Sequence, residues 1–111
     1  MSVRELVGRI QREVLAGNVS ASRAADLAVQ LAALLANINV EIREAEMAFN
    51  ARLLKELDAH EKANRARIVA ETSPEFERKR EARDTKEVVT EMIGSLKYVV
   101  RCEHEEMRLS R

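Results

Sequence analysis

The middle of the chain carries an apolar residue at every seventh position, and a second apolar row follows four residues behind the first. The first row is Ala24, Leu31, Ile38 and Ala45, and the second is Ala28, Leu35, Ile42 and Phe49. A seven-residue repeat places such side chains along one side of an α-helix. The pattern therefore predicts a long helix with a coiled-coil-like seam.

A second apolar pattern with helical spacing follows Pro74, which is the only proline of the chain. Its members are Val88, Val89, Met92, Ile93, Leu96, Val99, Val100 and Met107. Thr72 and Ser73 precede the proline and Glu75 follows it, which is the usual start of a helix: a capping hydroxyl, a proline in the first turn and an early acid. We therefore expect a helix over about residues 74–109. Two long helices separated by one break predict an antiparallel hairpin.

The first part of the chain predicts a shorter helix. Ser2 and Glu5 have the spacing of a capping box, and Gly17 with Asn18 supplies residues that tolerate the left-handed backbone at a helix end. These signals predict a helix over about residues 3–16. Ser20 or Ser22 can cap the next helix, which we expect over about residues 22–71 because no glycine or proline interrupts that range.

The composition agrees with an all-α fold made of one domain, residues 1–111. Of the 111 residues 46% are hydrophobic but only 3% are aromatic, so the core must consist of Leu, Ile, Val, Met and Ala. Such residues pack well along a seam and seldom enclose a deep centre. A thin core of this kind favours self-association.

The position of the break predicts the register of the hairpin. If the chain turns near residues 72 and 73, antiparallel partners have numbers that sum to about 145 at helical rise. This rule places Phe49 against Leu96 and Leu53 against Met92, which are all apolar. Nearer the turn it places Ala63 against Ala82.

The same register leaves the start of the long middle helix without a partner. Residues 22–36 extend beyond the returning helix, and the helix at 3–16 covers only one side of them. An exposed apolar patch of this kind is costly. We therefore predict a homo-oligomer, or binding to another protein, through Leu27, Leu31, Leu34 and Leu35.

The charges of the chain cancel, because nineteen basic residues face nineteen acidic ones. The segment ERKREARDTK at 77–86 nevertheless predicts a charged hairpin tip that is the alternative candidate for nucleic-acid binding. Its candidate contacts are Lys62, Arg65, Arg67, Arg78, Lys79, Arg80 and Arg83. Acids interleave with these bases at the spacing of helix-surface ion pairs, which favours a solvated, self-paired surface.

No residue pattern indicates a reaction. His60 lies far along the chain from Cys102 and His104, and the latter two are separated by two positions, so on a helix they point in different directions. No glycine-rich phosphate loop is present. The sequence predicts no catalytic residues, no metal site and no cofactor, and hence a non-enzymatic interaction module.

The expected location is the cytoplasm. Residues 24–36 are the most apolar stretch, and they fall short of the roughly 20 apolar residues that cross a bilayer. The first residues lack the pattern of a signal peptide because Arg4, Glu5 and Arg9 interrupt them. The single cysteine, Cys102, suits a reducing compartment.

The segment KANRARIVAETSPEFERKREARDTKEVVTEMIGSLKYVVRCEHEEMR, residues 62–108, resembles small helical proteins of unassigned function that are encoded by tailed phages and prophages. The resemblance rests on the charged hairpin around SPEF and on the amphipathic stretch EMIGSLKYVVR that follows. It implies a bacterial cytoplasm during infection or lysogeny, and an accessory role in phage DNA metabolism or particle assembly. It assigns no catalytic or binding residue.

Overall fold

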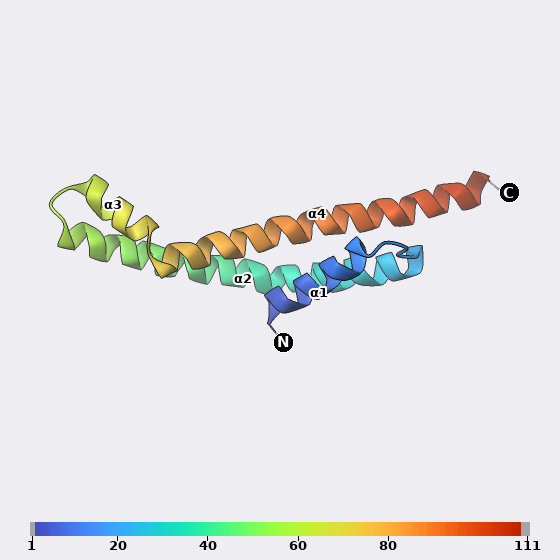
Figure 1. Cartoon of the computed structure of the whole chain (residues 1–111), viewed down its shortest axis with the longest axis horizontal. Helices are drawn as coiled ribbons and strands as arrows, with labels where there is room; N and C mark the ends of the chain where they lie inside the picture. The colour runs from blue at the N-terminus through green and yellow to red at the C-terminus, as the bar shows by residue number, and fades with distance from the viewer. Residues whose placement is uncertain (1, 110–111) are drawn as a thin grey trace. The chain divides into compact units, whose positions relative to one another are not determined.

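The computed structural model describes residues 2–109, and this part of the chain is helical with no strand (Figure 1). Four helices follow one another: α1 (Val3–Leu15), α2 (Ala21–Ala59), α3 (Ala63–Glu71) and α4 (Pro74–Leu109). The chain reverses direction after α2, so α3 and the start of α4 run antiparallel to the second half of α2, and the rest of α4 runs antiparallel to its first half (Figure 1). The predicted all-α fold with a long helical hairpin is confirmed.

The local signals at the first helix ends act as the sequence predicts. Ser2 Oγ accepts a hydrogen bond from the Glu5 amide at 3.1 Å, which caps α1. The chain then passes through the left-handed region at Gly17 and Asn18, with φ values of 83° and 58°. Ser20 Oγ accepts from the Arg23 amide at 3.1 Å and caps α2. Each contact satisfies an amide that the helix itself leaves without a partner.

The start of α4 also follows its sequence signal. Ser73 Oγ accepts a hydrogen bond from the Phe76 amide at 3.3 Å and donates one to the Ala70 carbonyl at the end of α3. Pro74 then opens α4, where its missing N–H costs nothing. A single hydroxyl therefore joins the end of one helix to the beginning of the next.

The prediction of an unbroken helix over residues 22–71 is wrong in its last part, because α2 ends at Ala59 and residues 63–71 form the separate helix α3. No side chain caps the start of α3 at Lys62. The break is explained by packing: Ala66 and Ala70 of α3 are fully buried, which a straight continuation of α2 would not achieve. Burial of the returning segment thus outweighs the local preference for continuing the helix.

The earlier reversal changes the register. Arg78 pairs with Glu41 and Phe76 contacts Phe49, so the partners' numbers sum to 119 and 125. The predicted sum of about 145 is wrong because the chain turns at residues 60–62 instead of 72–73. The predicted pairs Phe49–Leu96, Leu53–Met92 and Ala63–Ala82 are wrong for the same reason.

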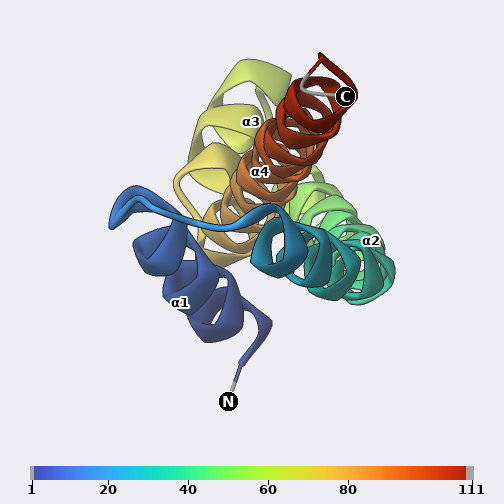
Figure 2. The same ribbon diagram turned by 90° about the vertical axis from the view of Figure 1, so that its right-hand side faces the viewer.

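The described chain divides into two compact units. The first unit comprises Met1–Asn37 and Thr85–Arg111. Within it, α1 and α4 flank the first half of α2 (Figure 2). Its core consists of Val7, Ile10, Ala24, Leu27, Leu31, Val89, Met92 and Leu96. At its end the Glu103 carboxylate accepts a hydrogen bond from the Ala21 amide at 3.1 Å, so an acid faces the positive end of α2.

The second unit, Ile38–Asp84, contains the second half of α2, all of α3 and the first turns of α4. Its buried apolar residues are Ile38, Ala45, Phe49, Ala66, Ala70 and Ala82. The only ring contact among the described residues joins Phe49 to Phe76, with centroids 5.5 Å apart. Small side chains dominate this core, so the helices pack through alanine and one aromatic pair.

Candidate interaction surface

Two opposite faces of α2 in the second unit differ sharply in burial. The inner face carries Ile38, Ala45 and Phe49, which are at most 8% exposed. The outer face carries Val40, Met47 and Leu54, which are 42%, 66% and 64% exposed. These three are again seven residues apart, so α2 has a second apolar row that its own chain leaves uncovered.

Three further exposed residues complete the repeat on the outer face. Arg43, Asn50 and Leu57 lie three positions after Val40, Met47 and Leu54. The resulting set of six, called the outer stripe below, alternates steps of three and four residues: Val40, Arg43, Met47, Asn50, Leu54 and Leu57. This spacing is that of a coiled-coil seam, in which each side chain of one helix packs between side chains of another.

Ion pairs tie several acids of α2 to α4 at the edge of the inner face. The Arg78 guanidinium donates to both carboxylate oxygens of Glu41, at 2.7 and 3.1 Å, and Arg83 donates to Glu46. These hydrogen bonds lower the pKa of each carboxyl group below its ordinary value. Both acids are therefore already paired with arginines of the same chain.

Three charged residues in or beside the outer stripe differ from these acids. Arg43, Lys55 and Asp58 are exposed and form no ion pair with any residue of the described range 2–109. The second unit thus presents, along an uncovered apolar row, two bases and one acid whose charges have no partner among the described residues.

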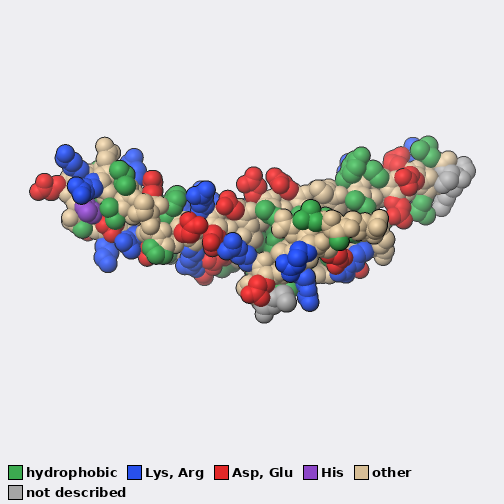
Figure 3. Space-filling model, in the orientation of Figure 1, with side chains coloured by type: hydrophobic (Ala, Val, Ile, Leu, Met, Phe, Trp, Pro, Cys, Tyr) green, Lys and Arg blue, Asp and Glu red, His purple; other side chains and the backbone are tan. Residues whose placement is uncertain are grey.

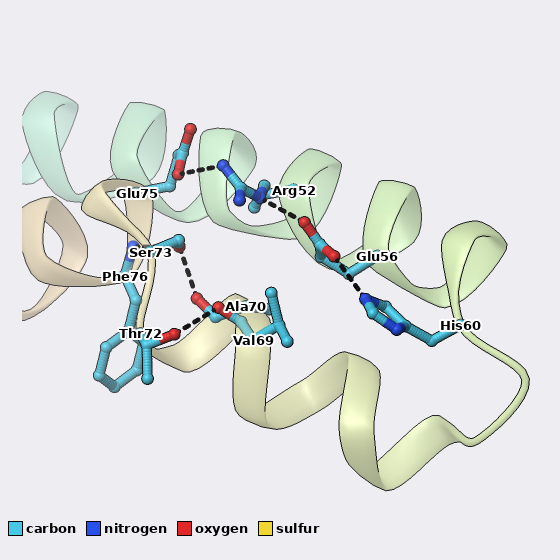
Figure 4. Close-up of polar contacts among 9 residues, drawn as sticks. All are labelled: Arg52, Glu56, His60, Val69, Ala70, Thr72, Ser73, Glu75 and Phe76. Carbon is cyan, nitrogen blue, oxygen red and sulfur yellow. Dashed lines mark hydrogen bonds and ion pairs between the residues drawn. The ribbon is translucent and has the colours of Figure 1, made fainter.

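Three polar residues, Arg52, Glu56 and His60, lie in a row at the end of α2 (Figure 4). Glu56, at 9% exposure, accepts a hydrogen bond from Arg52 Nε at 2.9 Å and lies 3.0 Å from His60 Nε2. Arg52 also reaches Glu75 at 3.5 Å. Burial alone raises the pKa of Glu56, but the hydrogen bonds from Arg52 and His60 outweigh it and lower the pKa. The ionised Glu56 therefore holds Arg52, and Arg52 in turn links α2 to Glu75 at the start of α4.

The leucines predicted as an oligomer interface lie in the first unit, and the structure separates them into two pairs. Leu27 and Leu31 are fully buried by their own chain, whereas Leu34 and Leu35 are half-buried. The premise that the returning helix does not reach them is wrong, because the earlier turn brings Glu103 of α4 to the Ala21 amide. In this structure Leu27 and Leu31 belong to the core and are not available to a partner.

The seven basic residues predicted as nucleic-acid contacts also divide. Arg78 and Arg83 are bound to Glu41 and Glu46, and the Lys79 ammonium lies 4.5 Å above the Phe49 ring. The remaining four are exposed and form no ion pair with a described residue: Lys62, Arg65, Arg67 and Arg80. On the face drawn in Figure 3, acidic and basic side chains alternate without a continuous basic area.

The residues considered for chemistry do not come together. Within residues 2–109 no group of three His, Cys, Asp or Glu side chains is placed to hold a metal ion. His60 binds Glu56 in the second unit, while Cys102 is half-buried in the first. A hydrogen bond with Cys102 raises the pKa of the Tyr98 hydroxyl, which is 63% exposed.

The apolar stretch of α2 is longer than residues 24–36, which the sequence indicated as its most apolar part. The helix contains one 18-residue window that is apolar enough to cross a membrane by length and composition alone, a test that the core helix of a soluble protein also passes. Only 17% of this window is buried by the chain itself. Much of the apolar surface of α2 is therefore uncovered in the isolated chain.

The sequence itself contains a signal for the outer stripe. Val40, Met47 and Leu54 repeat every seven residues, two positions after Ile38 and Ala45 of the predicted seam. Two rows on one helix compete for the inner side, and only the packing of α3 and α4 decides which row is buried.

Comparison with protein-family models, with curated proteins and with solved structures finds no match to this chain.

Proposed function

We propose that this protein is a non-enzymatic helical interaction module of the cytoplasm, which binds a partner helix through the outer stripe of α2. The observation that supports this proposal is the exposure of Val40, Met47 and Leu54 at seven-residue spacing. Fully burying a large aliphatic side chain is worth about 1.5 to 3 kcal/mol. Covering the three together therefore supplies a substantial driving force for association.

The polar members of the stripe favour a protein partner over a lipid surface. Arg43 and Asn50 lie between the apolar positions, in line with them. A guanidinium within a lipid-facing row is costly, whereas a coiled-coil seam accepts single polar residues and uses them to set its register. The expected partner is thus a helix with a complementary seam.

Nucleic-acid binding is the alternative function, and it has less support. Of the seven basic candidates, Arg78, Lys79 and Arg83 are engaged within the chain. The four exposed ones remain available for phosphate contacts: Lys62, Arg65, Arg67 and Arg80. Elution from heparin measures this alternative directly, because phosphate binding weakens steeply with salt.

The resemblance of residues 62–108 to phage-encoded helical proteins agrees with such a module. Among the roles that the resemblance implies, particle assembly needs a surface that binds other protein chains. The outer stripe is of that kind. An accessory role in assembly is therefore our proposal for the biological setting.

The proposal is tested by the oxidation rates of the methionines. Met47 of the outer stripe and Met107 are 66% and 56% exposed, so peroxide oxidises both rapidly in the isolated chain, while Met92, at 8%, reacts slowly. In an extract of the native cells, a partner bound to the outer stripe slows the oxidation of Met47, while the oxidation of Met107 stays rapid. Equal rates for Met47 and Met107, both in the extract and in concentrated purified protein, contradict the proposal.

A further inference from the structure

We infer that the helix covering the outer stripe is the outer stripe of a second copy of this chain, packed antiparallel to the first. The inference rests on the proposed function, because it requires that the stripe binds a helix at all. It adds the identity of the partner, the direction of the partner helix and the pair of charged residues that sets the register.

The order of residues in the outer stripe suits a two-fold antiparallel pair. In such a pair, the stripe residues that precede a step of three (Val40, Met47 and Leu54) lie beside those that follow it (Arg43, Asn50 and Leu57) on the other copy. Every contact therefore occurs twice. When Met47 lies beside Asn50 of the second copy, Val40 lies beside Leu57 and Arg43 lies beside Leu54. The two ends of the interface are then apolar, and the centre combines a flexible methionine with an amide.

The unpaired charges of α2 select this register. Arg43 and Asp58 are exposed and form no ion pair with a described residue of their own chain. A helical side chain points toward the N-terminus of its helix, so Arg43 extends from Leu54 of the second copy toward the second copy's Asp58. Two symmetric Arg43–Asp58 pairs result. A parallel pair instead places the two Arg43 guanidinium groups against each other.

The other acids of this region do not oppose the pairing. Glu41 and Glu46 are neutralised by Arg78 and Arg83 on α4, so their charges are already compensated when a second copy approaches. Glu44 lies 3.7 Å from the same Arg78 guanidinium. The outer stripe, together with Asp58 beside it, therefore offers a second copy an apolar seam with one base and one acid that have no ion-pair partner among residues 2–109.

Charge reversal tests the pairing without removing apolar surface. Arg43→Asp and Asp58→Arg each place like charges together at both ends of the antiparallel interface, and each is expected to weaken the dimer by more than about tenfold. Asp58→Arg puts a base in the last turn of α2, where the helix dipole favours it, so a lost dimer does not reflect a destabilised chain. Lys55→Asp is the matched control, since Lys55 is exposed, lies outside the stripe and forms no ion pair with a described residue.

Mixing the two variants tests the pairing of residue 43 with residue 58. A heterodimer of Arg43→Asp with Asp58→Arg contains two opposite-charge pairs, so equimolar mixing restores the dimer, and so does the double variant. Light scattering and sedimentation velocity at several concentrations measure both results. Failure of the mixture to restore association, with both single variants still folded by circular dichroism, overturns the charge pairing.

A distance measurement reports the direction of the helices independently. Asn39 is exposed and lies beside the stripe, and a nitroxide attached at Asn39→Cys in a Cys102→Ser chain labels each copy once. In the proposed register the two labels are 19 residues apart along the helix axes, which gives about 30 Å. A parallel pair brings them within about 20 Å, because packed helix axes lie close together.

The outcomes separate this inference from the proposed function. A dimer that Met47→Asp dissociates but whose labels lie within about 20 Å overturns the antiparallel pairing and leaves the interaction module intact. If the purified chain is a monomer at all concentrations, but Met47 is protected from oxidation in native extract, only the self-pairing is overturned. Protection of Met47 by vesicles of neutral and anionic lipid, without protein association, overturns both in favour of a lipid surface.

Discussion

Phe49 of α2 packs against Phe76 of α4 with ring centroids 5.5 Å apart and planes tilted by 55°. The Lys79 ammonium covers the Phe49 ring from 4.5 Å, so the same aromatic group contacts two successive turns of α4. Tilted ring pairs and cations over a ring face are both attractive arrangements. This cluster holds the register of the second unit, whose remaining core consists largely of alanine.

We expect Phe49→Ala to lower the free energy of unfolding by roughly 3 to 5 kcal/mol, because it removes a buried ring from a core of small side chains. Urea denaturation followed by circular dichroism measures the loss. Tyr98→Ala is the control, since Tyr98 is 63% exposed. Equal effects of the two substitutions contradict the assignment of Phe49 to the core.

Leu31→Ala is expected to cost roughly 2 to 5 kcal/mol, because Leu31 is fully buried in the first unit. The loss in thermal stability should not depend on protein concentration, since the side chain is covered by its own chain. Val29→Ala, at a position that is 70% exposed on the same helix, should have little effect. A loss that disappears at high protein concentration indicates instead that Leu31 lies at an interface between copies.

Ser73→Ala removes the hydroxyl that caps α4 and bonds the end of α3. We expect a loss of about 0.5 to 2 kcal/mol, the usual range for a helix cap. Amide exchange of Phe76, which donates to Ser73 Oγ, should accelerate in the variant. Ser95→Ala within α4 is the control because Ser95 is exposed. Unchanged exchange at Phe76 contradicts the capping role.

Acid should destabilise the second unit. Hydrogen bonds from Arg78 and Arg83 lower the pKa values of Glu41 and Glu46 below 4.5. Since the ionised acids are favoured in the folded chain, their contribution is complete above about pH 4.5 and is lost as the pH falls through the lower folded values. The double variant Glu41→Gln with Glu46→Gln should show a flatter decline of melting temperature in this range. The same decline in the variant and in the unmodified chain excludes these two pairs as its cause.

The ends of α1 and the start of α4 were determined by short sequence signals. Ser2 and Ser73 each satisfy an amide within three residues, and Gly17 adopts a left-handed backbone that other residues avoid. These contacts are local, so the sequence specifies them without knowledge of the rest of the fold. The all-α class follows from the same local preferences together with the apolar periodicity.

The end of α2, the register and the outer stripe were decided by the tertiary structure. No glycine or proline marks the turn at residues 60–62, which exists because it buries Ala66 and Ala70 and brings Phe76 to Phe49. The register then determines that Leu27 and Leu31 are covered and that Met47 and Leu54 are not. Apolar periodicity specifies that a helix has a side to bury, but α2 has two such rows, and only the segments that fold back against it select which one is covered.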